Sequence, residues 1–137
     1  MYFLNDEKIS CSCLFFHLSI FSFSQITSSQ IIGNWKVVKI LNEIGNQDLA
    51  NGFESAIFKF DNNFDFTLKS SNDNPLFSKI ESMTKNTKWK IDSLKNKIRI
   101  GTKKDNYSTI FIEVEQKNER VIFHLIESDI KLEMMKL

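Results

Sequence analysis

The chain has 137 residues, of which 42% are hydrophobic and 26% charged, and its formal net charge at pH 7 is +1. This length leaves room for one domain with one core, and the composition is that of a folded soluble protein rather than a disordered one. Because positive and negative residues are mixed along the whole chain, no basic stripe is available to bind a nucleic acid. The 13 Phe residues far outnumber the 2 Trp and 2 Tyr, which suits a small barrel filled or lined by bulky apolar side chains.

The first 24 residues have the pattern of a secretory signal peptide. An apolar run at residues 11–21 follows Lys8 and is too short to span a bilayer, which takes roughly 20 such residues. Ser22 and Ser24 place small side chains where signal peptidase reads the chain, so we predict cleavage after Ser24 and a secreted or periplasmic protein. Acidic residues precede Lys8, where a signal is usually positive. Three alternatives therefore stay open: a start elsewhere, an atypical N-terminal anchor, or a buried first helix or strand.

Both cysteines, Cys11 and Cys13, belong to this segment. Its removal would leave residues 25–137 without a thiol, so we expect neither disulfides nor thiol chemistry there. The apolar run follows the cysteines instead of preceding them, which argues against a lipoprotein anchor. The Cys-x-Cys spacing is interpreted as chance, and we expect no metal and no cofactor.

From Gly33 onward, apolar and polar residues alternate with a period of two, which is the pattern of β-strands. Short polar turns join most of the runs, which favours antiparallel neighbours. The predicted strands cover residues 33–40, 56–60, 64–69, 88–92, 97–101, 109–115, 121–126 and 130–134. Closing these strands into a barrel hides every edge and collects the apolar faces inside. We predict an all-β fold, an eight-stranded antiparallel up-and-down β-barrel with short helical turns in its loops, in preference to an open sandwich.

Two longer connections interrupt the alternation. Residues 41–55 contain Asn and Gly residues that break a strand, and we predict a long loop with one helical turn around residues 47–50. Loops of this length in a compact domain are often lids or binding loops. Residues 70–87 are polar but carry apolar residues at helical spacing, which predicts a loop with a short helix.

The tripeptide Gly33-Asn34-Trp35 stands at the start of the first strand, directly behind the predicted signal, and Lys36-Val37-Val38 follows it. In these residues, in its long first loop and in its eight predicted strands, the chain resembles the lipocalin-like group of the calycin superfamily. The resemblance is in particular to the short secreted lipocalin-like domains of bacteria. The resemblance implies that residues 25–137 form a lipocalin-like β-barrel domain. It also implies that Trp35 packs across the closed end of the barrel, with Gly33 letting the chain pass close beneath it.

The chain departs from the classical members of that group in its later part. Their Thr-Asp-Tyr segment has no counterpart here, the corresponding turn being residues 116–120. No arginine stands beyond the last strand to cover Trp35. The resemblance is therefore to the broad group.

Residues expected on the inward faces of the strands form either a pocket lining or a filled core, and the sequence alone does not separate the two. The candidate ligand-binding residues are Val37, Lys39, Phe58, Phe60, Phe66, Leu68, Trp89, Ile91, Tyr107, Ile112 and Phe123, with Gly33 and Trp35 as the marker of the barrel end. Lys39 has the parity of Val37 and either points into the barrel mouth toward a ligand carboxylate or is solvated at a strand end. Tyr107 either bonds a polar head group or is an ordinary strand-end tyrosine.

His124 is the one further residue considered for chemistry. It stands without a neighbouring carboxylate or second histidine in the sequence, and a structural role is favoured over that of a proton carrier or ligand. The acidic residues lie singly on outward faces, without the paired spacing of acid–base catalysis. We therefore expect no enzyme.

The leading hypothesis is an exported binding protein that takes up a small hydrophobic or amphipathic molecule inside its barrel, gated by the loop at residues 41–55. The alternative is a non-enzymatic structural or protein-interaction barrel with a filled core, which would use Phe111 and Ile122 on an outer face to contact a protein partner.

Overall fold

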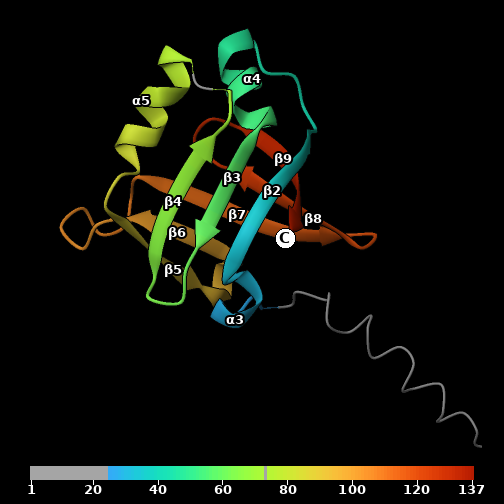
Figure 1. Cartoon of the computed structure of the whole chain (residues 1–137). Helices are drawn as coiled ribbons and strands as arrows, with labels where there is room; N and C mark the ends of the chain where they lie inside the picture. Colours follow the sequence, from blue (N-terminus) through green and yellow to red (C-terminus); the bar gives the residue numbers. More distant parts are fainter. Residues whose placement is uncertain (1–24, 73) are drawn as a thin grey trace, which may run out of the picture.

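The computed structural model describes residues 25–72 and 74–137, which form a closed barrel of antiparallel strands. The predicted signal peptide, residues 1–24, lies outside these residues. The strands are β2 (Gly33–Ile40), β3 (Ala56–Phe60), β4 (Asp65–Ser70), β5 (Thr87–Asp92), β6 (Lys97–Gly101), β7 (Ile110–Lys117), β8 (Arg120–Leu125) and β9 (Ile130–Lys136). They follow one another around the barrel in chain order, and β9 closes it against β2 (Figure 1). The predicted eight-stranded up-and-down barrel is confirmed, and its architecture is compatible with a lipocalin-like fold.

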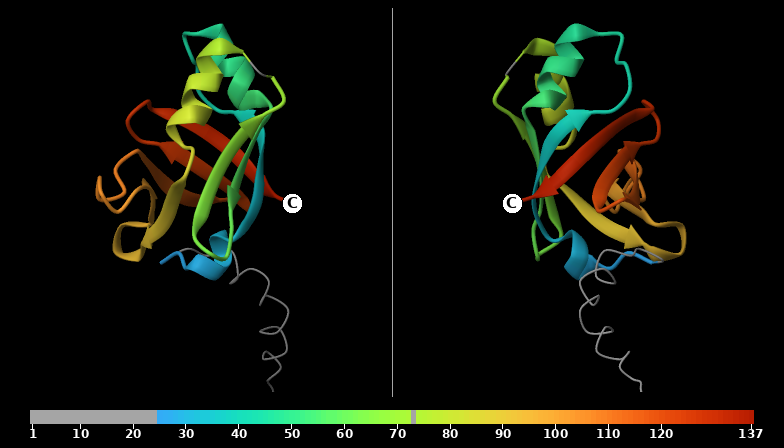
Figure 2. Two further views of the ribbon diagram at one scale, coloured as in Figure 1. Left: turned by 60° about the vertical axis from the view of Figure 1, so that its left-hand side comes forward. Right: turned by 90° about the vertical axis from the view of Figure 1, so that its right-hand side faces the viewer.

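Short helices cover the two ends of the barrel. The helix α3 (Ser28–Ile31) lies at one end, and α4 (Gln47–Glu54) and α5 (Pro75–Met83) lie together at the other (Figures 1 and 2). A 3-10 turn, η1 (Ser93–Lys95), joins β5 to β6. Across residues 25–72 and 74–137, none of the helices combines the length and the apolar character that crossing a bilayer requires.

Local capping explains where α4 and α5 begin. The side-chain oxygen of Asn46 accepts a hydrogen bond from the Leu49 N–H at 3.0 Å, and that of Asn74 accepts one from the Phe77 N–H at 2.9 Å. Asparagine is a favoured N-cap because it satisfies an N–H group that has no partner within the helix. The helix predicted in the second connection is confirmed as α5, whereas α4 is longer than the single turn predicted at residues 47–50.

A bulge in β2 changes which side chains of this strand face inward. The pairing with β9 is regular up to Val37 and shifts before Lys39, which reverses the alternation of the two faces. Lys39 is therefore exposed, and Ile40 packs against the core in its place. The inward orientation considered for Lys39 was wrong because the parity argument assumed an unbroken strand.

Aromatic rings pack against one another inside the barrel. Phe60 is the centre of this cluster, with its ring centroid 5.1 Å from that of Phe66, 5.5 Å from that of Trp89 and 6.1 Å from that of Phe123. The pairs with Trp89 and Phe123 are edge-on, an arrangement that aromatic quadrupoles favour, and the pair with Phe66 is tilted. Trp35 joins the cluster through Phe123 at 5.2 Å. This packing makes the barrel interior around Phe60 a core.

The buried indole nitrogens keep hydrogen bonds. Trp35 Nε1 donates to the carbonyl of Ile31 in α3 at 2.7 Å, and Trp89 Nε1 donates to the carbonyl of Asp61 at 3.2 Å. The first of these bonds attaches α3 to the barrel end beside Trp35. The second attaches the β3–β4 turn to the ring cluster.

The outward face of β8 is buried, as expected for a strand that is apolar on both faces. Ile122 points away from the core cluster, yet only 5% of it is exposed. Phe111, on the outer face of β7, is half-buried beneath the guanidinium of Arg99, whose carbon lies 5.2 Å from the ring centroid. The expected exposure of Ile122 was therefore wrong, and Phe111 is accessible only in part.

Candidate ligand-binding site

The helices α4 and α5 are packed tightly against each other above the barrel. Gly52 of α4 faces the ring of Phe77 so closely that a Cβ built on Gly52 would lie only 2.5 Å from Phe77 Cγ. The Phe53 ring meets the Phe77 ring edge-on at 5.1 Å. Where the two helices begin, Asn74 Nδ2 donates to the carbonyl of Asp48 at 2.8 Å. These contacts hold the two helices as one cover.

An apolar pocket lies under this cover, at the mouth of the barrel. Its volume is about 190 Å³. The lining consists of Leu49, Phe53, Ile80, Met83, Thr84, Thr109, Ile110, Leu125, Glu127, Ser128 and Ile130. Apart from Glu127, which is exposed at the rim, every lining residue is uncharged. The arrangement can bury a small apolar group and offer one carboxylate to its polar end.

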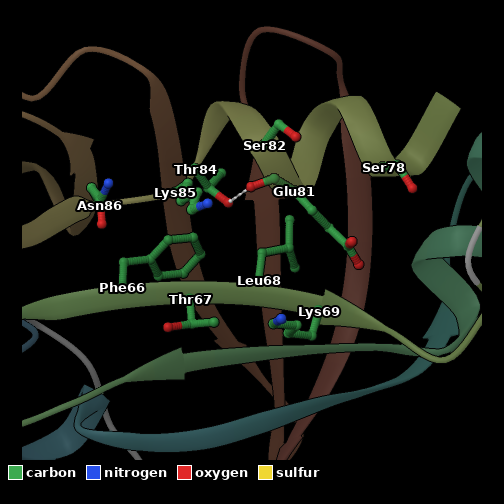
Figure 3. Close-up of a pocket in the computed structure, with 10 residues that line it drawn as sticks. All are labelled: Phe66, Thr67, Leu68, Lys69, Ser78, Glu81, Ser82, Thr84, Lys85 and Asn86. Carbon is green, nitrogen blue, oxygen red and sulfur yellow. Dashed lines mark hydrogen bonds between the residues drawn. The ribbon is translucent and has the colours of Figure 1, made fainter. Parts of the chain in front are cut away.

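A larger and more polar groove lies on the other side of α5, beside β4. Its volume is about 540 Å³. Figure 3 shows the lining: Phe66, Thr67, Leu68, Lys69, Ser78, Glu81, Ser82, Thr84, Lys85 and Asn86. Phe66 and Leu68 lie on the side of β4 that faces α5, and Thr67 lies on the other. Because Thr84 lines both spaces, the groove and the apolar pocket are neighbours across the end of α5.

The groove exists because β4 and β5 separate early. They pair only at Asp65 with Lys88 and at Phe66 with Thr87, and the Asp65 and Lys88 side chains form an ion pair at this short seam. The carboxylate of Asp65 raises the pKa of Lys88. Beyond Phe66, the edge of β4 faces α5 instead of a strand.

A side chain of α5 replaces part of the missing strand pairing. The Ser70 N–H donates to Glu81 Oε2 at 2.8 Å, across the gap between β4 and α5. In an antiparallel ladder, alternate residues turn their backbone groups to the same side, so the N–H and C=O of Leu68 point into the groove as the Ser70 N–H does. The groove therefore offers both backbone hydrogen-bonding groups and charged side chains.

The structure distributes the predicted ligand-binding residues over different places. Val37, Phe58, Phe60, Phe66, Leu68, Trp89, Ile112 and Phe123 are buried in the core, and Ile91 is half-buried against it. Only Phe66 and Leu68 of the predicted set line either the groove or the mouth pocket. Tyr107 lies half-buried in the loop between β6 and β7, with Lys90 Nζ 4.7 Å from its ring centroid.

His124 has two carboxylates beside it, although none is adjacent in the sequence. Its Nε2 lies 2.8 Å from Asp129 Oδ1, and its Nδ1 lies 3.6 Å from Glu113 Oε1. Glu113 is its cross-strand partner on β7, and Asp129 belongs to the turn that leads into β9. The expectation of a histidine without a nearby carboxylate was wrong, because strand pairing and a turn supply both. Within residues 25–72 and 74–137, no cluster of three or more His, Cys, Asp or Glu side chains is arranged to hold a metal ion.

Sequence reasoning missed most of the mouth pocket. Leu49 and Phe53 are four residues apart on α4, and Ile80 and Met83 are three apart on α5, so each helix turns an apolar pair toward the pocket. The apolar spacing on α5 was visible in the sequence, but nothing local showed that the helix would cover the barrel.

Comparison of the chain with models of protein families, with curated proteins and with solved structures gave no match.

Proposed function

We propose that this chain is an exported, lipocalin-like binding protein that holds a small hydrophobic or amphipathic molecule at the helix-covered mouth of its barrel. The observation that supports this most strongly is the apolar pocket between α4, α5 and the ends of β7, β8 and β9. The signal-like pattern of residues 1–24 supports the export, and Gly33-Asn34-Trp35 at the start of β2 supports the family assignment.

The size of the pocket limits the apolar part of the ligand. Its volume of about 190 Å³ is close to that of an engineered aliphatic cavity of about 150 Å³ that stays dry and binds benzene. A single ring or a short alkyl chain therefore fits. Burial of its surface would supply roughly 25 cal/mol per Å² before the entropic costs of association.

The position of this pocket changes the expected mode of binding. The hypothesis from the sequence placed the ligand among Phe58, Phe60 and Trp89, whose side chains are buried in the core. The ligand now proposed lies nearer the mouth, with the adjoining groove accepting a polar extension past Thr84. Glu127 at the pocket rim favours a hydrogen-bond donor or a positive group on that ligand.

The direct test is a titration with three compounds of one size, benzylamine, benzyl alcohol and benzoate, followed by NMR of the methyl groups. Saturable shifts of the Leu49, Ile80, Leu125 and Ile130 methyl groups are expected, in the affinity order amine, alcohol, acid. If none of the three compounds shifts these signals, the proposed function is wrong.

A matched pair of variants locates the binding. Met83, which is 61% exposed, lines the pocket, and Leu94, which is 86% exposed, lies on η1 outside it. Met83→Ser should weaken binding because it removes apolar surface from the pocket, and Leu94→Ser should leave binding unchanged. Equal effects of the two substitutions would show that the compounds bind elsewhere.

A second candidate function, a barrel that associates through its outer wall, is favoured by one observation. Ile57, 37% exposed, and Met135, 48% exposed, flank Lys36 on adjacent strands, and Val38 is 49% exposed on the same face of the barrel. Analytical ultracentrifugation over a wide concentration range separates the two candidates. Self-association that Ile57→Ser abolishes would support this second candidate.

A further inference from the structure

A stretch of the β4 edge faces the groove beside α5 instead of another strand. The Ser71 N–H donates to the carbonyl of Ser55 at 3.3 Å, and the Asp61 N–H donates to the carbonyl of Asp65 at 3.1 Å. These bonds show that the odd-numbered residues along β4 turn their backbone groups toward β3, so the even-numbered residues turn theirs away from it. The N–H and C=O of Leu68 therefore point out of the edge of the sheet.

The open part of this edge is short. On one side of it, Phe66 pairs with Thr87 of β5. On the other side, the Ser70 N–H donates to Glu81 Oε2. Between these contacts, the described part of the chain offers no hydrogen-bonding partner to the N–H and C=O of Leu68. An unpaired strand edge of this kind is a template for pairing with another chain.

The groove follows the open edge along both faces of the strand. Its lining includes Phe66 and Leu68, whose side chains are buried, and Thr67 and Lys69, which belong to the outward face. A space bounded by residues of both faces lies along the edge of a strand, because a space over one face would contact only alternate residues. The helix α5 forms the opposite wall (Figure 3). With about 540 Å³, the groove has room for a short extended segment beside β4.

The charged side chains of the groove favour an acidic occupant. Lys69 and Lys85 are exposed in its lining, and neither forms an ion pair with another described residue. The acidic residue of the lining, Glu81, already uses Oε2 to accept the Ser70 N–H. Carboxylates brought by a partner would therefore meet cations without a counter-charge. A second copy of this chain would bring its own Lys69 and Lys85 to the same place, and this repulsion opposes the pairing of two β4 edges.

We propose that the β4 edge binds an extended acidic segment of another protein by strand addition. In the antiparallel orientation, a single residue of that segment bonds both the N–H and the C=O of Leu68, which suits so short an edge. Because side chains alternate along a strand, this residue turns its side chain to the buried face, and its two neighbours turn theirs to the outward face, near Lys69. The preferred sequence is therefore an apolar residue between two acidic ones. This binding is independent of the ligand at the barrel mouth, since the two spaces share only Thr84 among their described lining residues.

The test is a titration with the peptide acetyl-Thr-Glu-Val-Glu-Thr-amide at constant ionic strength, followed by NMR and hydrogen exchange of the backbone amides. The Leu68 N–H should show a saturable shift and slower exchange, because it gains an acceptor. The Thr67 N–H is the internal control, since Thr67 pairs with Lys59 of β3 and its backbone groups face that strand, so its exchange should stay unchanged. Absence of saturable binding, or binding that leaves the exchange of Leu68 unchanged, would overturn the proposal.

Two altered peptides separate strand addition from general attraction. N-methylation of the central valine removes the N–H that bonds the Leu68 carbonyl, and we expect affinity to fall about tenfold. Replacement of both glutamates by lysine should also weaken binding, because the added cations repel those of the groove. Equal affinity of the methylated and the unmethylated peptide would contradict strand addition. A Leu68 shift that depends on protein concentration in the absence of peptide would assign the edge to a second copy of this chain and would also contradict the proposal.

Matched lysine variants test the charge of the groove. Lys69→Gln and Lys85→Gln should each lower peptide affinity about threefold, because each removes an exposed cation from the lining. Lys117 is exposed at the end of β7 and outside the groove, so Lys117→Gln should leave affinity unchanged. None of the three lysines forms an ion pair in the described structure, so all three variants should fold. Affinities equal to that of Lys117→Gln in both groove variants would contradict the proposed site.

Discussion

The ammonium nitrogen of Lys136 lies 5.6 Å from the centroid of the Trp35 ring, so a lysine of the last strand covers the tryptophan of the first. The same nitrogen donates to the carbonyl of Gln30 at 3.0 Å, which ties β9 to α3. Gly33 leaves room for this side chain, since a Cβ at Gly33 would meet Lys136 Cε at 2.8 Å. The covering role for which the sequence offered no arginine is therefore taken by a lysine.

Lys136→Ala should lower the free energy of unfolding by about 1 kcal/mol, because it removes a cation–π contact and a hydrogen bond. Burial removes water from the charged ammonium of Lys136 and thereby lowers its pKa. This loss of hydration keeps the net stabilisation from the two contacts small. Lys136→Arg should retain most of the stability. Urea denaturation measures both, and an alanine variant as stable as the parent would mean that the contact contributes nothing.

Gly52→Ala should destabilise the protein by about 1–3 kcal/mol, because the new methyl group overlaps the Phe77 ring. The direction of this change is informative, because replacing a glycine within a helix by alanine ordinarily stabilises a protein by roughly 0.5–1 kcal/mol. Gly45→Ala is the matched control, because nothing lies within 4 Å of a Cβ at Gly45. The midpoint temperature of thermal unfolding should fall for Gly52→Ala and should not fall for Gly45→Ala.

Phe60→Ala should cost about 3–5 kcal/mol, because the lost ring contacts Phe66, Trp89 and Phe123 in the core. Phe64→Ala is the control, since Phe64 is 42% exposed and its ring contacts that of Trp89 at 4.9 Å. Its cost should be well below that of Phe60→Ala in urea denaturation. Equal costs would show that the rings around Phe60 are not the main core.

The loop between β6 and β7 should weaken in acid. Asp105 Oδ1 accepts hydrogen bonds from the N–H groups of Thr102 at 2.9 Å and Ser108 at 3.2 Å. The bond from the Thr102 N–H is the largest cause that lowers the pKa of Asp105 below its usual 3.8. Because the pKa of Asp105 is lower in the folded state, the unfolded chain binds a proton more readily than the folded chain does. The stabilisation from the charged Asp105 is therefore present above pH 3.8 and is lost as the pH falls through the folded-state pKa.

Asp105→Asn tests this pH dependence. The variant should be less stable than the parent at neutral pH, and the difference should shrink as the pH falls below 3.8, the usual pKa of the aspartate. Urea midpoints measured at intervals of pH give the comparison. A difference that stays constant down to pH 2 would assign the effect to geometry rather than to the charge of Asp105.

The local pattern of the sequence predicted the strands well. Alternation such as that of Phe58 and Phe60 with Lys59 is a property of adjacent residues, and it places the observed β3 and its neighbours correctly. The turn residues also act locally: Asn118 and Glu119 take positive φ values of 52° and 71° between β7 and β8. The barrel followed because amphipathic strands joined by short turns pair in chain order.

Contacts between distant segments decided the rest. The bulge that turns Lys39 outward depends on the pairing of β2 with β9, and the carboxylates beside His124 are brought by a strand pair and a turn. The sequence by itself determined which residues form strands and which faces are apolar, because a period of two is local. Only the tertiary structure decided that the rings around Phe60 form a core and that the open space lies under α4 and α5. The reason is that helix packing and the early separation of β4 from β5 depend on residues far apart in the chain.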